Sequence, residues 1–471
     1  MHYVSTRGKA QPASSAQAIL QGLAPDGGLF MSAQPLAALH AQGDYAAVAA
    51  SVLQAAFSDS FSSEQLSHLA KTAYSTARFD APEIAPLTAV GRHHVLELFH
   101  GPTASFKDMA LSVLPGLMSL AKEQLAPGQD IVVLTATSGD TGSATMAGFR
   151  GMPGFKVIVF YPEHGVSPVQ QAQMQRMAGD NLCAVAIRGD FDQAQHGVKG
   201  IFARRQELAP NTLLSSANSI NIGRLIPQMA YYLKASQQLD RRGIPFSVPT
   251  GNFGDIFAGA LALGESPLIC ATNDNDVLKD CLQQGIYDRR RQLKKTLSPS
   301  MDILVSSNFE RALYLAGGAD AARTAQVMHK LEQEGAARIP ETMHHALQAR
   351  YLAASCSDAQ ALASIRSCWQ QHGYLMDPHS VAGWHALQQF GMAEGVVVST
   401  ASPYKFPAAV LTALELDVPE DPLAQIRTLE QATGVSVPAS LDGLFEQPVL
   451  HDTCIDADQM AAFVQQKVAV W

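Results

Sequence analysis

The stretch Ile131-Val-Val-Leu-Thr-Ala-Thr-Ser-Gly-Asp-Thr-Gly-Ser143 indicates the fold class of this chain. Its apolar start predicts a short buried strand, its glycine-rich second half predicts a turn, and Ala144–Phe149 predicts a helix. Other apolar runs are likewise followed by turns of small and polar residues: Val95–Phe99, Val157–Tyr161, Phe246–Val248 and Val396–Val398. Strands alternating with helices predict an α/β fold with a mostly parallel sheet, in which ligands gather at the carboxyl ends of the strands.

Changes in composition divide the chain into parts. An Ala-, Leu- and Ser-rich stretch at 33–77 has helical spacing, and a second helical pattern appears before the last strand signals. We expect the following parts: an N-terminal helical unit at 1–90, a smaller α/β part at 91–225, a larger α/β part at 226–415 with a helical insertion at about 310–370, and a mixed tail at 416–471.

The composition excludes several classes of protein. Of 471 residues, 47% are hydrophobic and 16% charged, which is ordinary for a globular chain, and the net charge of −9 disfavours binding to nucleic acid. No apolar run reaches the ~18 residues of a membrane span, and the N-terminus lacks a signal peptide. The six cysteines are scattered without zinc or disulfide spacing. We therefore expect a cytoplasmic protein with free thiols.

A candidate catalytic lysine lies in Leu98-Phe-His-Gly-Pro-Thr-Ala-Ser-Phe-Lys107. The turn signal Gly101-Pro-Thr103 is expected to place Lys107 at the start of a helix, between Phe106 and the apolar residues Met109–Leu111. An enclosed apolar setting lowers the pKa of a lysine and makes it a nucleophile for a Schiff base. An exposed surface lysine before a helix is the alternative reading of the same segment.

Two turns are candidate anion sites. In Thr135–Ser143, backbone N–H groups at a helix start and the hydroxyls of Thr137, Ser138 and Thr141 suit a carboxylate or phosphate, although an ordinary capped turn would look similar. Thr250-Gly-Asn-Phe-Gly-Asp255 also lets backbone approach an anion, but it lacks the lysine of a nucleotide P-loop and the spacing of a dinucleotide site. Two such turns and one lysine suit an amino acid together with a phosphate-bearing cofactor.

These features together resemble the threonine synthase family, in its bacterial and fungal branch. The resemblance covers nearly the whole chain, and it includes Tyr3-Val-Ser-Thr-Arg-Gly8, Gly22-Leu-Ala-Pro-Asp-Gly-Gly-Leu-Phe30, Asn218-Ser-Ile-Asn221, Ala271-Thr-Asn-Asp-Asn-Asp276, Ser298-Pro-Ser-Met-Asp-Ile303, Ser306-Ser-Asn-Phe-Glu310 and Met376-Asp-Pro-His379. It implies the tryptophan-synthase-β-like fold, which is fold type II of the pyridoxal-phosphate enzymes, preceded by the family's N-terminal domain.

The resemblance also implies roles for individual residues. Lys107 would carry pyridoxal 5'-phosphate as a Schiff base, Asp140 would lie near its ring hydroxyl, and Thr400 would meet its ring nitrogen. The cofactor phosphate would be held by the backbone of Gly251, Asn252, Phe253, Gly254 and Asp255. The substrate would be held by Thr137, Ser138, Gly139 and Thr141 at its carboxylate and by Arg224 or Lys405 at its phosphate, unless those two cations form structural ion pairs.

The implied activity is that of a carbon–oxygen lyase acting on phosphates. It would convert O-phospho-L-homoserine and water to L-threonine and phosphate by γ-elimination and β-hydration, with a small molecule as its partner, no nucleic acid or membrane, and a monomer or homodimer as its state. A phospho-amino-acid lyase giving a keto acid and a non-catalytic cofactor-binding relative are the alternatives. The first is kept because Glu163 and His164 stand where relatives commonly have basic residues.

Two further segments depart from the family pattern, and three polar side chains have open or structural roles. Asn221–Arg224 lacks the usual tryptophan, and Ser402 replaces a common histidine. His100 suits either an acid–base or a structural role, whereas Asp377 and His379 are expected to be structural.

Overall fold

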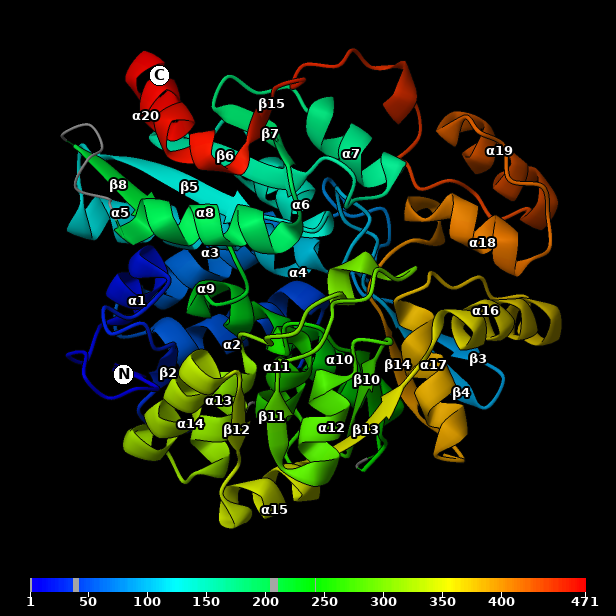
Figure 1. The fold of residues 1–471 in the computed structure, drawn as a ribbon, viewed down its shortest axis with the longest axis horizontal. Coiled ribbons are helices and arrows are strands. Elements are labelled where there is room, and N and C mark those ends of the chain that lie inside the picture. Colours follow the sequence, from blue (N-terminus) through cyan, green and yellow to red (C-terminus); the bar gives the residue numbers. More distant parts are fainter. Residues whose placement is uncertain (1, 37–41, 204–210, 242) are drawn as a thin grey trace.

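Two α/β layers lie side by side in the computed structural model, which describes residues 2–36, 42–203, 211–241 and 243–471 (Figure 1). The larger sheet has six strands, and all its pairs are parallel except β3–β4. Its strands run in the order β13 (Tyr351–Ser355), β10 (Leu268–Thr272), β9 (Phe246–Pro249), β14 (Val396–Ser399), β4 (His93–Glu97) and β3 (Leu87–Val90).

The smaller sheet has five strands, and its pairs are all parallel. Their order is β15 (Cys454–Asp456), β7 (Leu182–Arg188), β6 (Phe155–Pro162), β5 (Asp130–Ala136) and β8 (Thr212–Ser215). Residues alternate between its faces, so Val132 and Leu134 pack with α8 (Phe191–Ala203) and α20 (Met460–Val470), whereas Ile131 and Val133 pack into the main core. Both faces are therefore buried.

Helices also cover both faces of the larger sheet. Val95, Ile269 and Val397 contribute to a core with α16 (Asp358–His372), α17 (Ser380–Gln389) and α18 (Pro407–Ala413). The opposite face joins the main core. The helices that pack there or between the sheets are α4 (Lys107–Leu111), α5 (Leu114–Leu125), α6 (Asp140–Phe149), α7 (Pro168–Gln175), α9 (Ile222–Leu225), α10 (Met229–Leu239), α11 (Gly254–Ala262) and α12 (Val277–Gln284).

The N-terminal unit is mainly helical. It contains α1 (Ser15–Gln21), α2 (Tyr45–Phe57) and α3 (Ser63–Ala73), beside the antiparallel pair β1 (Tyr3–Ser5) and β2 (Phe30–Ser32). The remaining elements are α13 (Phe309–Ala316), α14 (Ala321–Glu334), α15 (Glu341–Arg350), α19 (Pro422–Thr433), β11 (Ile286–Asp288), β12 (Ala336–Arg338) and the short 3₁₀ turns η2 (Ile226–Gln228), η3 (Pro299–Met301), η4 (Pro403–Lys405), η5 (Leu444–Glu446) and η6 (Ala457–Gln459).

The expected division into parts needs correction at several places. The segment 310–370 is not only helical, because β13 pairs with β10 at the edge of the larger sheet and β12 pairs with β11. The tail is not separate either, because β15 pairs with β7 in the smaller sheet. Likewise β4 belongs to the larger sheet although it precedes the smaller one in the chain. These pairings join residues far apart in sequence, which local composition does not reveal.

Among the residues described, none of the helices is both long enough and apolar enough to cross a membrane.

Candidate active site

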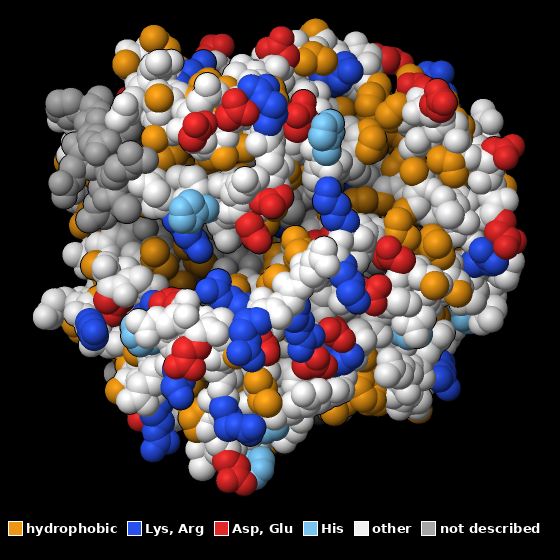
Figure 2. Space-filling view, in the orientation of Figure 1, with side chains coloured by type: hydrophobic (Ala, Val, Ile, Leu, Met, Phe, Trp, Pro, Cys, Tyr) orange, Lys and Arg blue, Asp and Glu red, His pale blue; other side chains and the backbone are white. Residues whose placement is uncertain are grey.

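A cavity of about 1800 Å³ lies where the turns that follow β5, β9 and β14 meet α4 and α9. Figure 2 shows it as a hollow on one face, with Lys and Arg side chains beside it. This is the place expected for a ligand, since the carboxyl ends of parallel strands point toward it. Lys107, Ser138, Arg224 and Thr400 line it together with the turn Thr250–Asp255.

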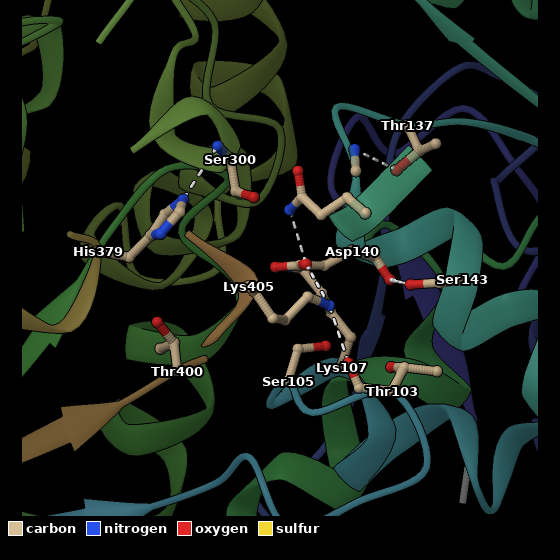
Figure 3. Close-up of polar contacts among 12 residues, drawn as sticks. Thr103, Ser105, Lys107, Thr137, Asp140, Ser143, Ser300, His379, Thr400 and Lys405 are labelled. Carbon is tan, nitrogen blue, oxygen red and sulfur yellow. Dashed lines mark hydrogen bonds and ion pairs between the residues drawn. The ribbon is translucent and has the colours of Figure 1, made fainter. Parts of the chain in front are cut away.

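Lys107 begins α4 and is buried beside the carboxylate of Asp140, the first residue of α6. The Nζ of Lys107 lies 2.9 Å from Oδ2 of Asp140 and 4.6 Å from the ring centroid of Phe106 (Figure 3). Burial lowers the pKa of Lys107 despite the neighbouring carboxylate, and Lys405 and Arg224 lower it further. Lys107 is therefore enclosed with a lowered pKa, as the sequence predicted, and it also lies beside an anion.

Asp140 is held ionised by the same cluster. Burial alone would raise the pKa of its carboxyl, but Lys107 and Lys405 hold it well below its usual range. Its Oδ1 lies 2.7 Å from Nζ of Lys405 and accepts a hydrogen bond from Nε2 of Gln170 at 2.7 Å. Asp140 thus presents a fixed, buried negative charge to the cavity.

The turn after β9 has the geometry of an anion cradle. Phe253 adopts a left-handed φ of 63°, and its ring is held 5.1 Å from those of Phe309 and Tyr351. Such a conformation is strained for a residue with a side chain, so this packing has to maintain it. Within the described part of the chain, the N–H groups of Gly251–Asp255 have no protein acceptor. These N–H groups are therefore free to bind an anion at the start of α11.

The turn after β5 is shaped by Thr137. Its Oγ1 accepts hydrogen bonds from the N–H groups of Gly139 at 2.9 Å and Gly142 at 3.0 Å, and Gly139 has a φ of 136° that favours glycine. The hydroxyls of Ser138 and Thr141 are half-buried at the cavity. The structure therefore gives Thr137 a shaping role in the loop, while Ser138 and Thr141 remain available to a ligand.

Arg224 is a buried cation without a counter-ion. It is 3% exposed, and its Nη1 donates a hydrogen bond to the carbonyl oxygen of Ala217 at 2.9 Å, while its Nε has no partner. No carboxylate of the described residues lies within ion-pair distance, and burial lowers its pKa to about 10. A buried cation that faces a cavity without a counter-ion is a natural site for an anionic group.

Two family models cover most of the chain. The model described as pyridoxal-phosphate dependent enzyme matches residues 76–402, and the model described as threonine synthase N terminus matches residues 2–74. The threonine synthase of Pseudomonas aeruginosa is 38% identical over 428 residues, which cover 87% of this chain and 90% of that protein. The chain belongs to the threonine synthase family.

Further relatives of the threonine synthase family agree. Threonine synthase of Saccharomyces cerevisiae is 33% identical over 485 residues, covering 91% of this chain and 94% of that protein. The crystal structure of pyridoxal-phosphate-bound threonine synthase from Brucella melitensis matches with a TM-score of 0.88 and 36% identity, covering 99% of this chain and 98% of that one. The fold class, the pyridoxal-phosphate cofactor and the lyase class expected from the sequence are thereby confirmed.

Two candidate residues, Lys405 and His100, make the structural contacts that the sequence analysis had left open as alternatives. Lys405 is a structural ion-pair residue, because it pairs with Asp140 and is absent from the described lining of the cavity. His100 lies 2.7 Å from Asp80 and 2.8 Å from Glu97. Burial acts against its charge, but these carboxylates raise its pKa, so its structural role is the supported one.

The loop with Glu163 and His164, which departs from the family pattern, lies outside the site. His164 is 87% exposed in its side chain and lies 3.8 Å from Glu163, and neither residue is among the described residues lining the cavity. The departure from family pattern at these positions therefore does not alter the walls of the site. Ser402, another departure, instead caps η4 through a hydrogen bond from the N–H of Tyr404.

Several contacts at the cavity were not predicted from the sequence. Gln170 donates a hydrogen bond to Asp140. Asp255 does more than form part of the turn, because its Oδ1 accepts hydrogen bonds from the hydroxyls of Tyr231 at 2.5 Å and Tyr232 at 2.7 Å. His379 lines the cavity and accepts a hydrogen bond at Nε2 from the N–H of Ser300 at 3.2 Å. Among these residues, the adjacent tyrosines Tyr231 and Tyr232 in an apolar helical pattern were the only sequence feature that could have indicated such a contact.

Gly251→Ala is expected to weaken cofactor binding. A Cβ there would lie 3.0 Å from the carbonyl oxygen of Ser300 and 3.2 Å from Cα of Met301, so the turn has to shift. We expect the dissociation constant of pyridoxal phosphate to rise about 10- to 100-fold, measured by fluorescence titration of apoprotein. Gly200→Ala is the control, because a Cβ meets nothing within 4 Å there. Equal affinities of the two variants would contradict the cradle.

Proposed function

We propose that the protein converts O-phospho-L-homoserine and water to L-threonine and phosphate. The observation that carries this proposal is the combination, in one cavity, of a buried Lys107 with a lowered pKa, two turns with unused donors and the cation of Arg224, which has no counter-ion among the described residues. A dianionic amino acid and a phosphate-bearing cofactor need these groups at once. The family to which the chain belongs supports the same activity.

The residues present fit pyridoxal phosphate. Its phosphate would be held by the backbone N–H groups of Gly251–Asp255, its ring hydroxyl would lie near Asp140, and its ring nitrogen would meet the hydroxyl of Thr400. The N–H of Thr400 donates to the hydroxyl oxygen of Ser380 at 2.9 Å and its carbonyl oxygen accepts from the N–H of Phe106 at 2.8 Å, which fixes the backbone of Thr400 beside the cavity. When bound, the cofactor supplies an electron sink for charge at the substrate's α-carbon.

The chain's own side chains would handle protons and orient the substrate. Lys107, freed by the substrate's amino group, is placed to take the Cα proton and return it. The substrate carboxylate would accept hydrogen bonds from Ser138, Thr141 and the N–H groups of their turn, with Gly139 allowing its close approach. The leaving phosphate would pair with Arg224, since a charge-assisted contact there also satisfies the buried guanidinium.

Product analysis tests the proposal against its rivals. Purified enzyme supplied with O-phospho-L-homoserine should release phosphate and L-threonine in equal amounts, measured by phosphate assay and amino-acid chromatography. Phosphate released with a keto acid and without threonine would instead identify the phospho-amino-acid lyase. A protein that binds the cofactor and turns over nothing would be the non-catalytic relative. The exposed position of His164 outside the cavity favours the synthase over the first rival.

The proposal extends to the setting in which the enzyme works. A small-molecule substrate is the partner that the cavity suits, and the protein would act in the cytoplasm as a monomer or homodimer. The cysteines support a reducing compartment, since Cys183, Cys270, Cys281, Cys356, Cys368 and Cys454 are free thiols.

A further inference from the structure

Lys405 is a buried cation that the proposed reaction does not use. It ends η4, its side chain is 0% exposed, and it is not among the described residues that line the cavity. Its Nζ donates a hydrogen bond to the carbonyl oxygen of Thr103 at 2.8 Å and lies 2.7 Å from Oδ1 of Asp140. Because a buried lysine needs compensation, Asp140 is the anion that makes this burial tolerable.

Asp140 is shared between two lysines. Oδ2 lies 2.9 Å from Nζ of Lys107, whereas Oδ1 faces Lys405 and the side-chain amide of Gln170, each at 2.7 Å. In Figure 3 the side chains of Lys107, from α4, and Lys405, from η4, both reach the carboxylate of Asp140. One carboxylate therefore compensates two cations, only one of which reaches the cavity.

This sharing matters because Lys107 has to lose its proton before its amine can attack a carbonyl carbon. With Lys107 as its only cation, Asp140 would then be a buried carboxylate without a counter-charge, which is strongly unfavourable. We propose that Lys405 is a positioning residue that stays paired with Asp140 while Lys107 leaves the pair as a neutral amine. The inference rests on the proposed function only in taking Lys107 as the cofactor-bearing lysine.

Other titratable groups face this cluster from neighbouring elements: Arg224 of α9, Asp255 of α11, Asp108 of α4 and His379 at the start of α17. Arg224 adds a like charge, which lowers the pKa of Lys107. Burial raises the pKa of both Asp255 and Asp108 to about 6. Asp255 accepts hydrogen bonds from tyrosine hydroxyls, and Asp108 accepts them from Thr103 and from the N–H of Ser105. Asp140 is thus the anion in direct contact with Lys107.

The test follows the pH dependence of amine labelling at Lys107 in the full-length apoprotein, using an acylating reagent and peptide mass spectrometry. Lys405→Met removes a like charge and leaves Asp140 to Lys107 alone, and both changes raise the pKa of Lys107. The labelling midpoint should move up by about 1–2 pH units. At a fixed pH below both midpoints, labelling should then slow about 10- to 100-fold.

Two matched variants separate charge from contact. Gln170→Met removes a neutral donor from the same oxygen of Asp140, so it should shift the midpoint much less. Lys405→Arg keeps the charge and should restore a midpoint near that of the wild type. In the holoenzymes, the pH at which the cofactor absorbance changes should move in the same direction as the labelling midpoint.

A folded Lys405→Met protein with an unchanged midpoint, or an equal shift in Gln170→Met, would overturn the proposal. If the neutral variants do not fold, the wild type decides. In the wild type, Lys107 should be labelled at a lower pH than the exposed lysines of the same sample. If Lys107 and the exposed lysines were labelled over the same pH range, the proposal would also be overturned. Labelling needs neither cofactor nor substrate, so this outcome is separate from a failure to make threonine.

Discussion

Lys107→Ala should lower kcat by roughly 10⁴-fold or more, because it removes both the covalent attachment point and the positioned proton carrier. The fold should survive, since Asp140 keeps Lys405 and Gln170 as partners and no buried charge is stranded. Steady-state kinetics with O-phospho-L-homoserine gives the rate, and calorimetry gives the unfolding temperature. Borohydride treatment of the wild type should fix the cofactor on the peptide that contains Lys107.

The control for this variant is an exposed lysine. Lys71 lies on α3 in the N-terminal unit and is not among the described residues that line the cavity. Lys71→Ala should therefore keep wild-type kinetics. Substantial residual turnover in Lys107→Ala, or borohydride trapping at another lysine, would show that the wrong lysine was identified. Loss of activity together with loss of the folded state would point instead to a structural role.

Arg224→Met should lower kcat/KM by about 10²- to 10³-fold while leaving the protein at least as stable as the wild type. The loss follows from removing the cation expected at the substrate phosphate, where a buried charge pair is worth about 2–5 kcal/mol. The stability follows from the burial of a guanidinium with no carboxylate among the described residues, which costs free energy in the unliganded protein. Kinetics and denaturant unfolding measure the two effects separately.

Another buried arginine provides the matched comparison. Arg311 is also fully buried, but its donors are used by the carbonyl oxygens of Phe30 and Ile220 and by Asn308. Arg311→Met should therefore lower the free energy of unfolding by about 2–3 kcal/mol, since it leaves buried acceptors unsatisfied. If Arg224→Met instead destabilised the fold as much and left KM unchanged, Arg224 would be structural and the phosphate would need another partner.

Local sequence patterns predicted the strand–turn–helix units and the enclosed position of Lys107, because each of these depends on residues that are neighbours in the sequence. The turn Thr250–Asp255 follows a strand and begins a helix as expected, and its glycines occur where backbone has to approach a ligand. The edge strand Tyr351–Ser355 was missed, because its small residues suit a helix equally well and its partner β10 lies far away in the chain. Tertiary pairing overrides propensity at such positions.

The sequence by itself determined the α/β class, the family and the cofactor, and it singled out Lys107 as the candidate reactive lysine, since the order of motifs along the chain carries all of these. Only the tertiary structure decided which charges are paired. It separated Lys405, which is paired with Asp140, from Arg224, which has no carboxylate partner among the described residues, although both are single basic residues flanked by apolar ones. The physical reason is that the strength of a charge depends on the groups that meet it and on the exclusion of water, and both arise when distant segments pack.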